Sequence, residues 1–182
     1  MNKNIIKIPN FITPEEVEMI KHEILSNEEK IKSMGDNHTV LVDGDSLTGR
    51  YWCYNFITNN TVVKNILYYK LLLLFGRKRF VKCWANTYRE GQGFKHHVHR
   101  DRYDPRQGQL KDWTCGHITI ADPNHIGIKY GDELMHPEVG EFQIFPSFLP
   151  HSVPKNTSDD VRITLAMDVF VNRTSKLETQ LK

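Results

Sequence analysis

The sequence predicts an α+β fold, in which N-terminal helices pack on an antiparallel barrel or sandwich, and a jelly roll is the natural candidate. Helical periodicity is confined to the first part of the chain, about residues 1–76. Short β-like segments separated by Gly, Pro and Asp fill about residues 79–171. The 182 residues, 39% hydrophobic and 25% charged, suit one globular domain covering 1–182.

The N-terminal part contains a clear helix start. A short strand is expected at 5–8, and Thr13, Pro14 and Glu16 then fit a capping box with Pro at the first helical position. Apolar residues recur at helical spacing after this start, which predicts a helix over 14–26.

The following segment is polar and rich in Gly and Asp, which indicates a hairpin or loop around 39–42. A second apolar periodic stretch predicts a helix over 60–75, with Gly76 as its C-cap. Beyond Gly76, the β-like segments are 80–88, 94–99, 114–121, 126–130, 141–145 and 161–171.

Composition limits the partners and the compartment. With 24 basic against 22 acidic residues, the net charge of +2 gives no reason to expect a nucleic-acid partner, and no apolar run is long enough to span a bilayer. The three cysteines form no CxxC pair, which favours a reducing cytoplasm, that of the host cell if the chain is viral. We expect a small-molecule or peptide substrate and no membrane partner.

Four potential metal ligands lie within six residues, in the run His96-His97-Val98-His99-Arg100-Asp101. On a strand, residues two apart face the same way, so His97, His99 and Asp101 can point together while His96 and Val98 point away. Two histidines and one carboxylate on one face of an octahedron suit iron(II) and leave positions open for substrate.

The third ligand has to come from another strand. His151 lies 54 residues after His97, beyond the segment 141–145, in a loop that could close the triad. Arg162 follows eleven residues later and shares a strand face with Thr164. A guanidinium fork with a nearby hydroxyl suits the distal carboxylate of a keto acid, whereas the alternative for Arg162 is a surface ion pair with a neighbouring aspartate.

Three blocks of sequence resemble the 2-oxoglutarate/Fe(II)-dependent dioxygenases. They are Pro9-Asn-Phe-Ile-Thr-Pro-Glu-Glu-Val17; Trp84-Ala-Asn-Thr-Tyr-Arg-Glu-Gly91 with the histidine run; and Gly140 to Val153 with Arg162-Ile-Thr-Leu165. The likeness is to the virus-type oxygenases and to the wider prolyl-4-hydroxylase-like group. It implies a double-stranded β-helix, Fe(II), 2-oxoglutarate, turnover supported by ascorbate, and hydroxylation of a peptidyl proline or another amino acid.

The resemblance leaves two ligand sets open. Counted from Tyr88 and Gly91, the first ligand falls on His97, which gives His97/His99/His151. The alternative His99/Asp101/His151 keeps the carboxylate that many relatives have. The resemblance also suggests that Asn86 and Tyr88 help to hold 2-oxoglutarate or line its pocket, with core packing as the alternative for Tyr88.

Two other classes compete with the oxygenase. A cupin would share Gly91 and the His97-x-His99 spacing, but no Glu follows at the expected distance, and His151 lies too far beyond Gly140. A metal-free jelly-roll binding module would give no reason for the spacing between His151 and Arg162.

Overall fold

The computed structural model describes residues 5–37, 41–42, 44–77, 79–99 and 113–171. The helices are α1 (Pro14–Ser26), α2 (Glu28–Ser33), α3 (Phe56–Asn59) and α4 (Thr61–Phe75), and the 3-10 helices are η1 (Leu47–Arg50) and η2 (Pro123–His125). The strands are β1 (Ile6–Ile8), β2 (Arg79–Tyr88), β3 (Phe94–His97), β4 (Thr114–Ala121), β5 (Ile128–Tyr130), β6 (Glu133–Met135), β7 (Phe142–Pro146), β8 (His151–Val153) and β9 (Arg162–Val171).

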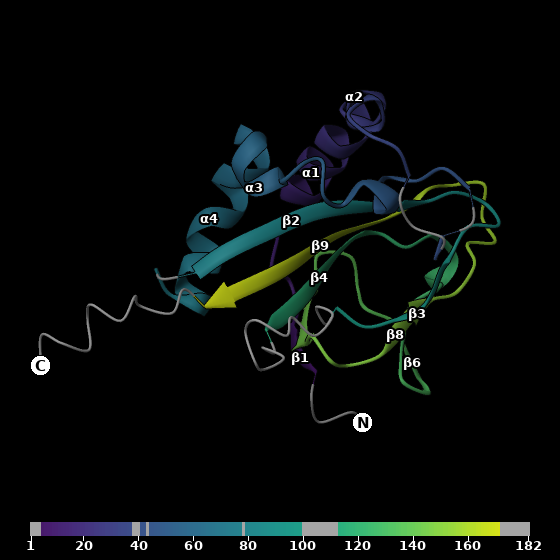
Figure 1. The fold of residues 1–182 in the computed structure, drawn as a ribbon. Helices are drawn as coiled ribbons and strands as arrows, with labels where there is room; N and C mark the ends of the chain where they lie inside the picture. The colour runs from purple at the N-terminus through teal and green to yellow at the C-terminus, as the bar shows by residue number, and fades with distance from the viewer. Residues whose placement is uncertain (1–4, 38–40, 43, 78, 100–112, 172–182) are drawn as a thin grey trace, which may run out of the picture.

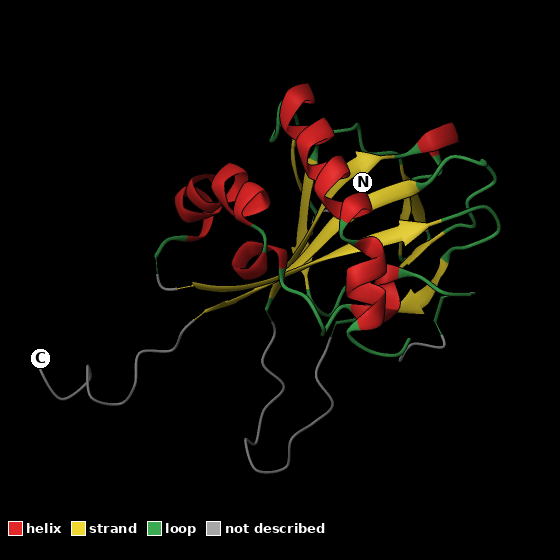
Figure 2. Cartoon of the chain, turned by 90° about the horizontal axis from the view of Figure 1, so that it is seen from above, coloured by secondary structure: helices red, strands yellow, loops and turns green. Residues whose placement is uncertain are grey.

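The strands form two antiparallel sheets that face each other. The major sheet has five strands in the order β1-β7-β4-β9-β2, and the minor sheet has four in the order β3-β8-β5-β6. The helices lie on one side of the major sheet and the minor sheet on the other (Figure 1). Seen from above, the helices cover the long strands (Figure 2). This confirms the α+β jelly-roll fold, although the two sheets are not closed into a barrel.

The two long helices form for the reasons visible in the sequence. The Thr13 side chain accepts a hydrogen bond from the Glu16 amide, and the Glu16 carboxylate accepts one from the Thr13 amide, so the capping box of α1 is present. The Asn60 side chain caps α4 by accepting from the Val63 amide. Gly76 ends α4 at a φ of 75°, a conformation that glycine adopts without strain.

The outer face of the major sheet is apolar and forms the main core with the helices. Residues two apart along β9 share this face, and the members of the core on this strand are Ile163, Leu165, Met167 and Val169. They pack with apolar side chains of α1 and α4, among them Ile20 and Leu67, neither of which has exposed surface. The buried face of each helix is therefore the face that its sequence period predicts.

The inner face of the same sheet is largely polar and points toward the minor sheet. Asn86 on β2 and Thr119 on β4 are both register partners of Thr164 on β9, and all three are buried. Directly opposed residues on adjacent strands project from the same face. Burial on both faces thus combines an apolar core with a polar interior, and the polar interior holds the candidate site.

Several elements differ from the sequence-based prediction. Helix α2 and strands β6 and β8 were not expected, because segments of three to six residues carry too little periodicity to identify. Residues 39–40 of the predicted hairpin around 39–42 lie outside the described residues, and Val42 pairs with Phe94 in an isolated antiparallel bridge. None of the described helices is long and apolar enough to cross a membrane.

A buried carboxylate ties the helical layer to the end of β2. Both oxygens of Glu28 accept from the Arg89 guanidinium, at 2.8 and 2.9 Å, and Lys32 Nζ lies 3.0 Å from the same carboxylate. Burial alone would raise the pKa of Glu28, but its hydrogen bonds and its ion pairs with Arg89 and Lys32 lower it overall. Glu28 therefore stabilises the fold in its ionised form.

We expect Glu28→Gln to lower the free energy of unfolding by about 1–2 kcal/mol at pH 7. The amide has no negative charge and only one acceptor oxygen, so it cannot accept both hydrogen bonds from the Arg89 guanidinium. The folded pKa of Glu28 lies below its unfolded value, so its contribution is complete above the unfolded pKa and disappears as the pH falls through the folded one. The difference in the free energy of unfolding between the parent and Glu28→Gln should therefore become smaller at acidic pH, as measured by urea denaturation. The control is Glu29→Gln, because Glu29 is 88% exposed on the same helix. Equal losses for both variants would contradict the assignment.

Candidate metal centre and its cavity

Strands β3 and β8 bring His97 and His151 side by side. The two residues are register partners, and their ring centroids lie 4.1 Å apart. His97 Nδ1 lies 2.9 Å from the Lys95 carbonyl oxygen, and His151 Nδ1 lies 3.0 Å from that of Leu149. A carbonyl only accepts, so both Nδ1 atoms carry the proton and both Nε2 atoms keep a free lone pair.

His99 joins this pair from just beyond the end of β3. Its backbone amide donates to the Ser147 carbonyl at 2.9 Å, and its ring centroid lies 5.4 Å from His97 and 5.0 Å from His151. One potential ligand atom from each of the three residues lies within 4.8 Å of the others. We call His97, His99 and His151 the histidine cluster. The predicted parity holds for His97 and His99, and His96 is exposed as expected.

The surroundings keep His97 and His151 neutral. Burial, helped by the nearby charge of His99, lowers the pKa of His97 to about 4. Burial also lowers the pKa of His151 well below its ordinary value, and the charges of His97, His117 and His99 add to this effect. Neutral imidazole is the form that binds metal ions. His151 Nε2 is buried and has no hydrogen-bond partner.

The sequence predicted that a loop presents His151, but this residue lies on a strand. β7 ends at Pro146, and His151 is the first residue of β8, where its backbone pairs with both β3 and β5. A residue held by strands on both sides is more rigid than one in a loop. Asp101, the alternative ligand, lies outside the described residues.

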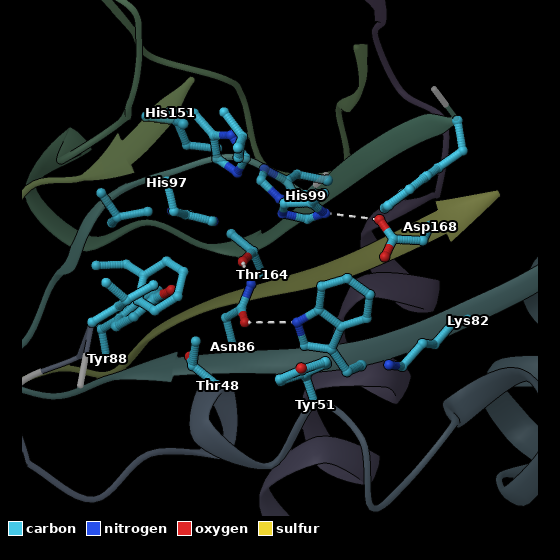
Figure 3. A pocket seen from close by; sticks show the side chains of 18 of the residues that line it. Thr48, Tyr51, Lys82, Asn86, Tyr88, His97, His99, His151, Thr164 and Asp168 are labelled. Atoms are coloured by element: carbon cyan, nitrogen blue, oxygen red, sulfur yellow. Dashed lines mark hydrogen bonds and ion pairs between the residues drawn. The ribbon is translucent and has the colours of Figure 1, made fainter. Parts of the chain in front are cut away.

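A cavity of about 400 Å³ lies between the histidine cluster and the inner face of the major sheet. In Figure 3, the three histidines lie on one side of this cavity, and Asn86, Thr48 and Tyr51 lie across from them, with Thr164 between. Its volume is within the range of small-molecule sites. Polar groups from β2, β4 and β9 therefore face the same space as the histidines.

Two of the predicted cofactor-binding residues, Asn86 and Thr164, are joined by a hydrogen bond in the cavity wall. Asn86 Nδ2 donates to Thr164 Oγ1 at 3.2 Å, while Asn86 Oδ1 accepts from the Trp84 indole. Because Thr164 Oγ1 accepts this bond, its own hydroxyl proton remains available as a donor. Tyr88 also lines the cavity, and burial raises the pKa of its phenol to about 12, so the hydroxyl stays protonated.

Arg162 is fully buried, so the alternative of a surface arginine is wrong. Its Nε donates to Asp122 Oδ1 at 2.9 Å and its Nη2 to the Gly127 carbonyl at 3.1 Å. Its Nη1 is buried and has no partner. Arg162 is the register partner of Tyr88, at the same end of the sheet interior. Arg162 therefore has one nitrogen, Nη1, left to donate to an anion, and it does not offer two free nitrogens side by side.

Other polar residues in this interior were not among the predicted site residues. His117 and Thr119 share the inner face of β4, and His117 Nδ1 and Thr119 Oγ1 are buried without partners. Asp168 was missed, although it follows Arg162 and Thr164 at even spacing on β9. Thr48 of η1 and Tyr51, just beyond its end, reach the cavity only through tertiary packing, so no sequence signal could have found them.

The residues present fit a bound iron(II) ion. The cluster offers three imidazoles, one of them with a buried nitrogen that lacks a partner, and nitrogen ligands of this kind suit iron. In the described part of the chain, a second group of three potential ligands consists of His99, Cys115 and Asp168, which shares His99 with the cluster.

The comparisons agree with this chemistry. Residues 119–168 match the family model described as "Putative 2OG-Fe(II) oxygenase". No curated protein matches the sequence. Among solved structures, the viral collagen prolyl hydroxylase of Paramecium bursaria Chlorella virus-1, in complex with 2-oxoglutarate, superposes with a TM-score of 0.65 at 14% identity, covering 92% of this chain and 96% of the viral one.

Two bacterial structures are similar as well. A Pseudomonas putida prolyl-4-hydroxylase gives a TM-score of 0.60 at 15% identity and covers 95% of each chain. HygX from Streptomyces hygroscopicus, with nickel, 2-oxoglutarate and hygromycin B bound, gives 0.65 at 10% identity, covering 94% of this chain and 84% of HygX. At such identities the superpositions establish the fold, and the family model adds a likeness over residues 119–168. The chain is thus similar to 2-oxoglutarate/Fe(II)-dependent oxygenases in its fold and over residues 119–168.

Proposed function

We propose that the histidine cluster holds the iron and that the protein hydroxylates a peptidyl proline or another amino acid. The observation that carries the metal assignment is the convergence of three imidazoles at the wall of one polar cavity, with two Nδ1 protons directed to backbone carbonyls. The set His99/Asp101/His151 is the competing assignment.

Arg162, Thr164, Asn86 and Tyr88 are assigned to the cosubstrate. Arg162 Nη1 and the Thr164 hydroxyl are donors without a partner of their own at the same end of the sheet, and a carboxylate would accept from both. Asn86 orients the Thr164 hydroxyl through its hydrogen bond. Tyr88 adds a neutral phenol beside Arg162, whose guanidinium carbon lies 5.8 Å from the centre of the Tyr88 ring.

The reaction divides between cofactors and protein. Bound Fe(II) and 2-oxoglutarate supply the oxygen activation that no side chain can provide, with ascorbate proposed to support turnover. The residues of the chain hold both groups in fixed relative positions and exclude water from the space between the sheets. This is a role for rigid, buried side chains, and the cluster and most of the cavity wall consist of strand residues and residues next to them.

Aromatic side chains at one end of the cavity support an amino-acid or peptide substrate. Tyr51 is 43% exposed, and its ring centroid lies 5.9 Å from that of Trp84. Lys82 Nζ lies 4.3 Å from the centre of the Tyr51 ring. Aromatic faces bind apolar rings such as that of proline. Two of the similar structures described above are prolyl hydroxylases.

The remaining proposals concern the chain as a whole. We propose that it works as one domain over 1–182, because the helices and the major sheet share a single hydrophobic core. A reducing compartment such as the cytoplasm suits its three free cysteines. The balanced charge supports a small-molecule or peptide substrate over nucleic acid.

We expect His151→Ala to weaken Fe(II) binding by more than about 100-fold, since loss of a ligand should exceed the 10–100-fold effect of an outer partner. Anaerobic metal titration measures this directly. His22→Ala is the matched control, because His22 is exposed on α1. Parent-like affinity in the His151 variant, with circular dichroism unchanged, would rule out this centre.

We expect Arg162→Ala to raise the KM for 2-oxoglutarate by about 10–100-fold, which corresponds to the roughly 1.5–3 kcal/mol of a hydrogen bond to a charged group. Because this variant also leaves Asp122 unpaired, Thr164→Val provides a milder second test, with an expected rise of about tenfold. Both variants should still bind Fe(II). An unchanged KM in the two folded variants would refute the cosubstrate assignment.

The substrate is identified by measuring succinate release across classes: prolyl peptides, free amino acids, nucleobases and other small metabolites. We expect stimulation by a prolyl peptide or an amino acid, accompanied by a product that has gained one oxygen atom. Stimulation by nucleobases alone would contradict the proposed substrate class. Decarboxylation of 2-oxoglutarate without substrate remains the measure of the intact centre.

A further inference from the structure

We propose that Asp168 is a positioning residue of the metal centre that acts on the iron through His99. Its carboxylate fixes the His99 ring with Nε2 toward the metal and supplies the negative charge that three neutral imidazoles lack. The inference rests on the proposed function, because it takes the histidine cluster as the ligand set.

The first support is the partner of each ring. His99 Nδ1 lies 2.7 Å from Asp168 Oδ1, and the two side chains are only 10% and 12% exposed. An ionised carboxylate only accepts, so Nδ1 carries the proton and Nε2 keeps its lone pair. His97 and His151 instead donate to neutral backbone carbonyls. Of the three members of the cluster, His99 is therefore the one with a charged acceptor, and this bond is short, as charge-assisted bonds are.

The second support is the difference in rigidity between the partners. Asp168 lies within β9, where Lys82 on β2 and Cys115 on β4 are its register partners, so strands flank it on both sides. The Cys115 thiol also donates to Asp168 Oδ1 at 3.1 Å. His99 lies beyond the last residue of β3 and has no strand pairing of its own. The bond to Asp168, drawn in Figure 3, thus fixes a ligand next to the minor sheet to β9, an interior strand of the major sheet.

The third support is charge. Two imidazoles and a carboxylate would leave a bound iron(II) site with one positive charge, whereas three imidazoles would leave it with two. A carboxylate hydrogen-bonded to a ligating imidazole increases the basicity of that ligand and fixes its orientation, and removing such a partner costs about 10–100-fold in metal affinity. Asp168 would offset one of the two positive charges of a site with three imidazoles, through its hydrogen bond with His99.

The test compares Asp168→Asn and Asp168→Ala with the parent by anaerobic Co(II) titration. Asn keeps the shape and an acceptor oxygen but loses the charge, so we expect Co(II) affinity about 10–100-fold below the parent for Asn and lower still for Ala. In Zn(II)-loaded protein with ¹⁵N-labelled histidine, the His99 Nδ1 proton should resonate far downfield and move upfield in Asp168→Asn. A purely structural role for Asp168 would not produce this shift while the circular dichroism spectrum stays unchanged.

Failure of this inference is distinguishable from failure of the proposed function. If His151→Ala abolishes Co(II) binding but Asp168→Asn binds like the parent and leaves the His99 proton unmoved, Asp168 has no such role and the cluster remains. If Asp101→Asn abolishes binding while Asp168→Asn does not, the carboxylate of the centre is Asp101. If Cys115→Ala weakens Co(II) binding as much as Asp168→Asn does, the metal lies in the group His99, Cys115 and Asp168 instead, and the inference is overturned.

Discussion

The rest of the structure depends on the two-sided alternation of the central strands β4 and β9. On β9, the side chains that pack in the core with the helices are Ile163, Leu165, Met167 and Val169, whereas Thr164 and Asp168 face the cavity. Because side chains alternate with a period of two, a shift of one residue would move Arg162 into the apolar core and Ile163 into the site. Burial of the outer face against α1 and α4 therefore fixes the register of the inner face, and with it the positions of the proposed cofactor-binding groups.

The polar interior has an energetic consequence. His151 Nε2, Arg162 Nη1 and Thr119 Oγ1 are all buried without a protein partner. An unpaired buried polar group costs about 1–3 kcal/mol. An iron ion and a keto acid carry the charges that such groups need, so ligand binding would recover free energy already spent in folding. Arg162 is a special case, since Asp122 balances part of its charge and leaves one donor group available.

The site was predictable to the extent that local periodicity places it. Strand parity selected His97 and His99 over His96, and even spacing on one strand paired Arg162 with Thr164; the structure has these arrangements. The same parity extended by four residues would have reached Asp168, which was overlooked because no histidine or arginine lies beside it in the sequence. The partner of Arg162 could not be found in this way, because Asp122 lies 40 residues away.

The α+β fold, the capped helices, the long strands and the residue types of the site could be predicted from the sequence, because each of these depends on spacing within one segment. Two contacts arise only in the folded chain: β3 pairs with β8, which brings His97 and His151 together, and His99 hydrogen-bonds Asp168 across the two sheets. Short strands such as β8 have almost no propensity signal of their own and form only when neighbouring strands offer hydrogen bonds and burial. The contacts that complete the site are therefore long-range ones, which no local pattern records.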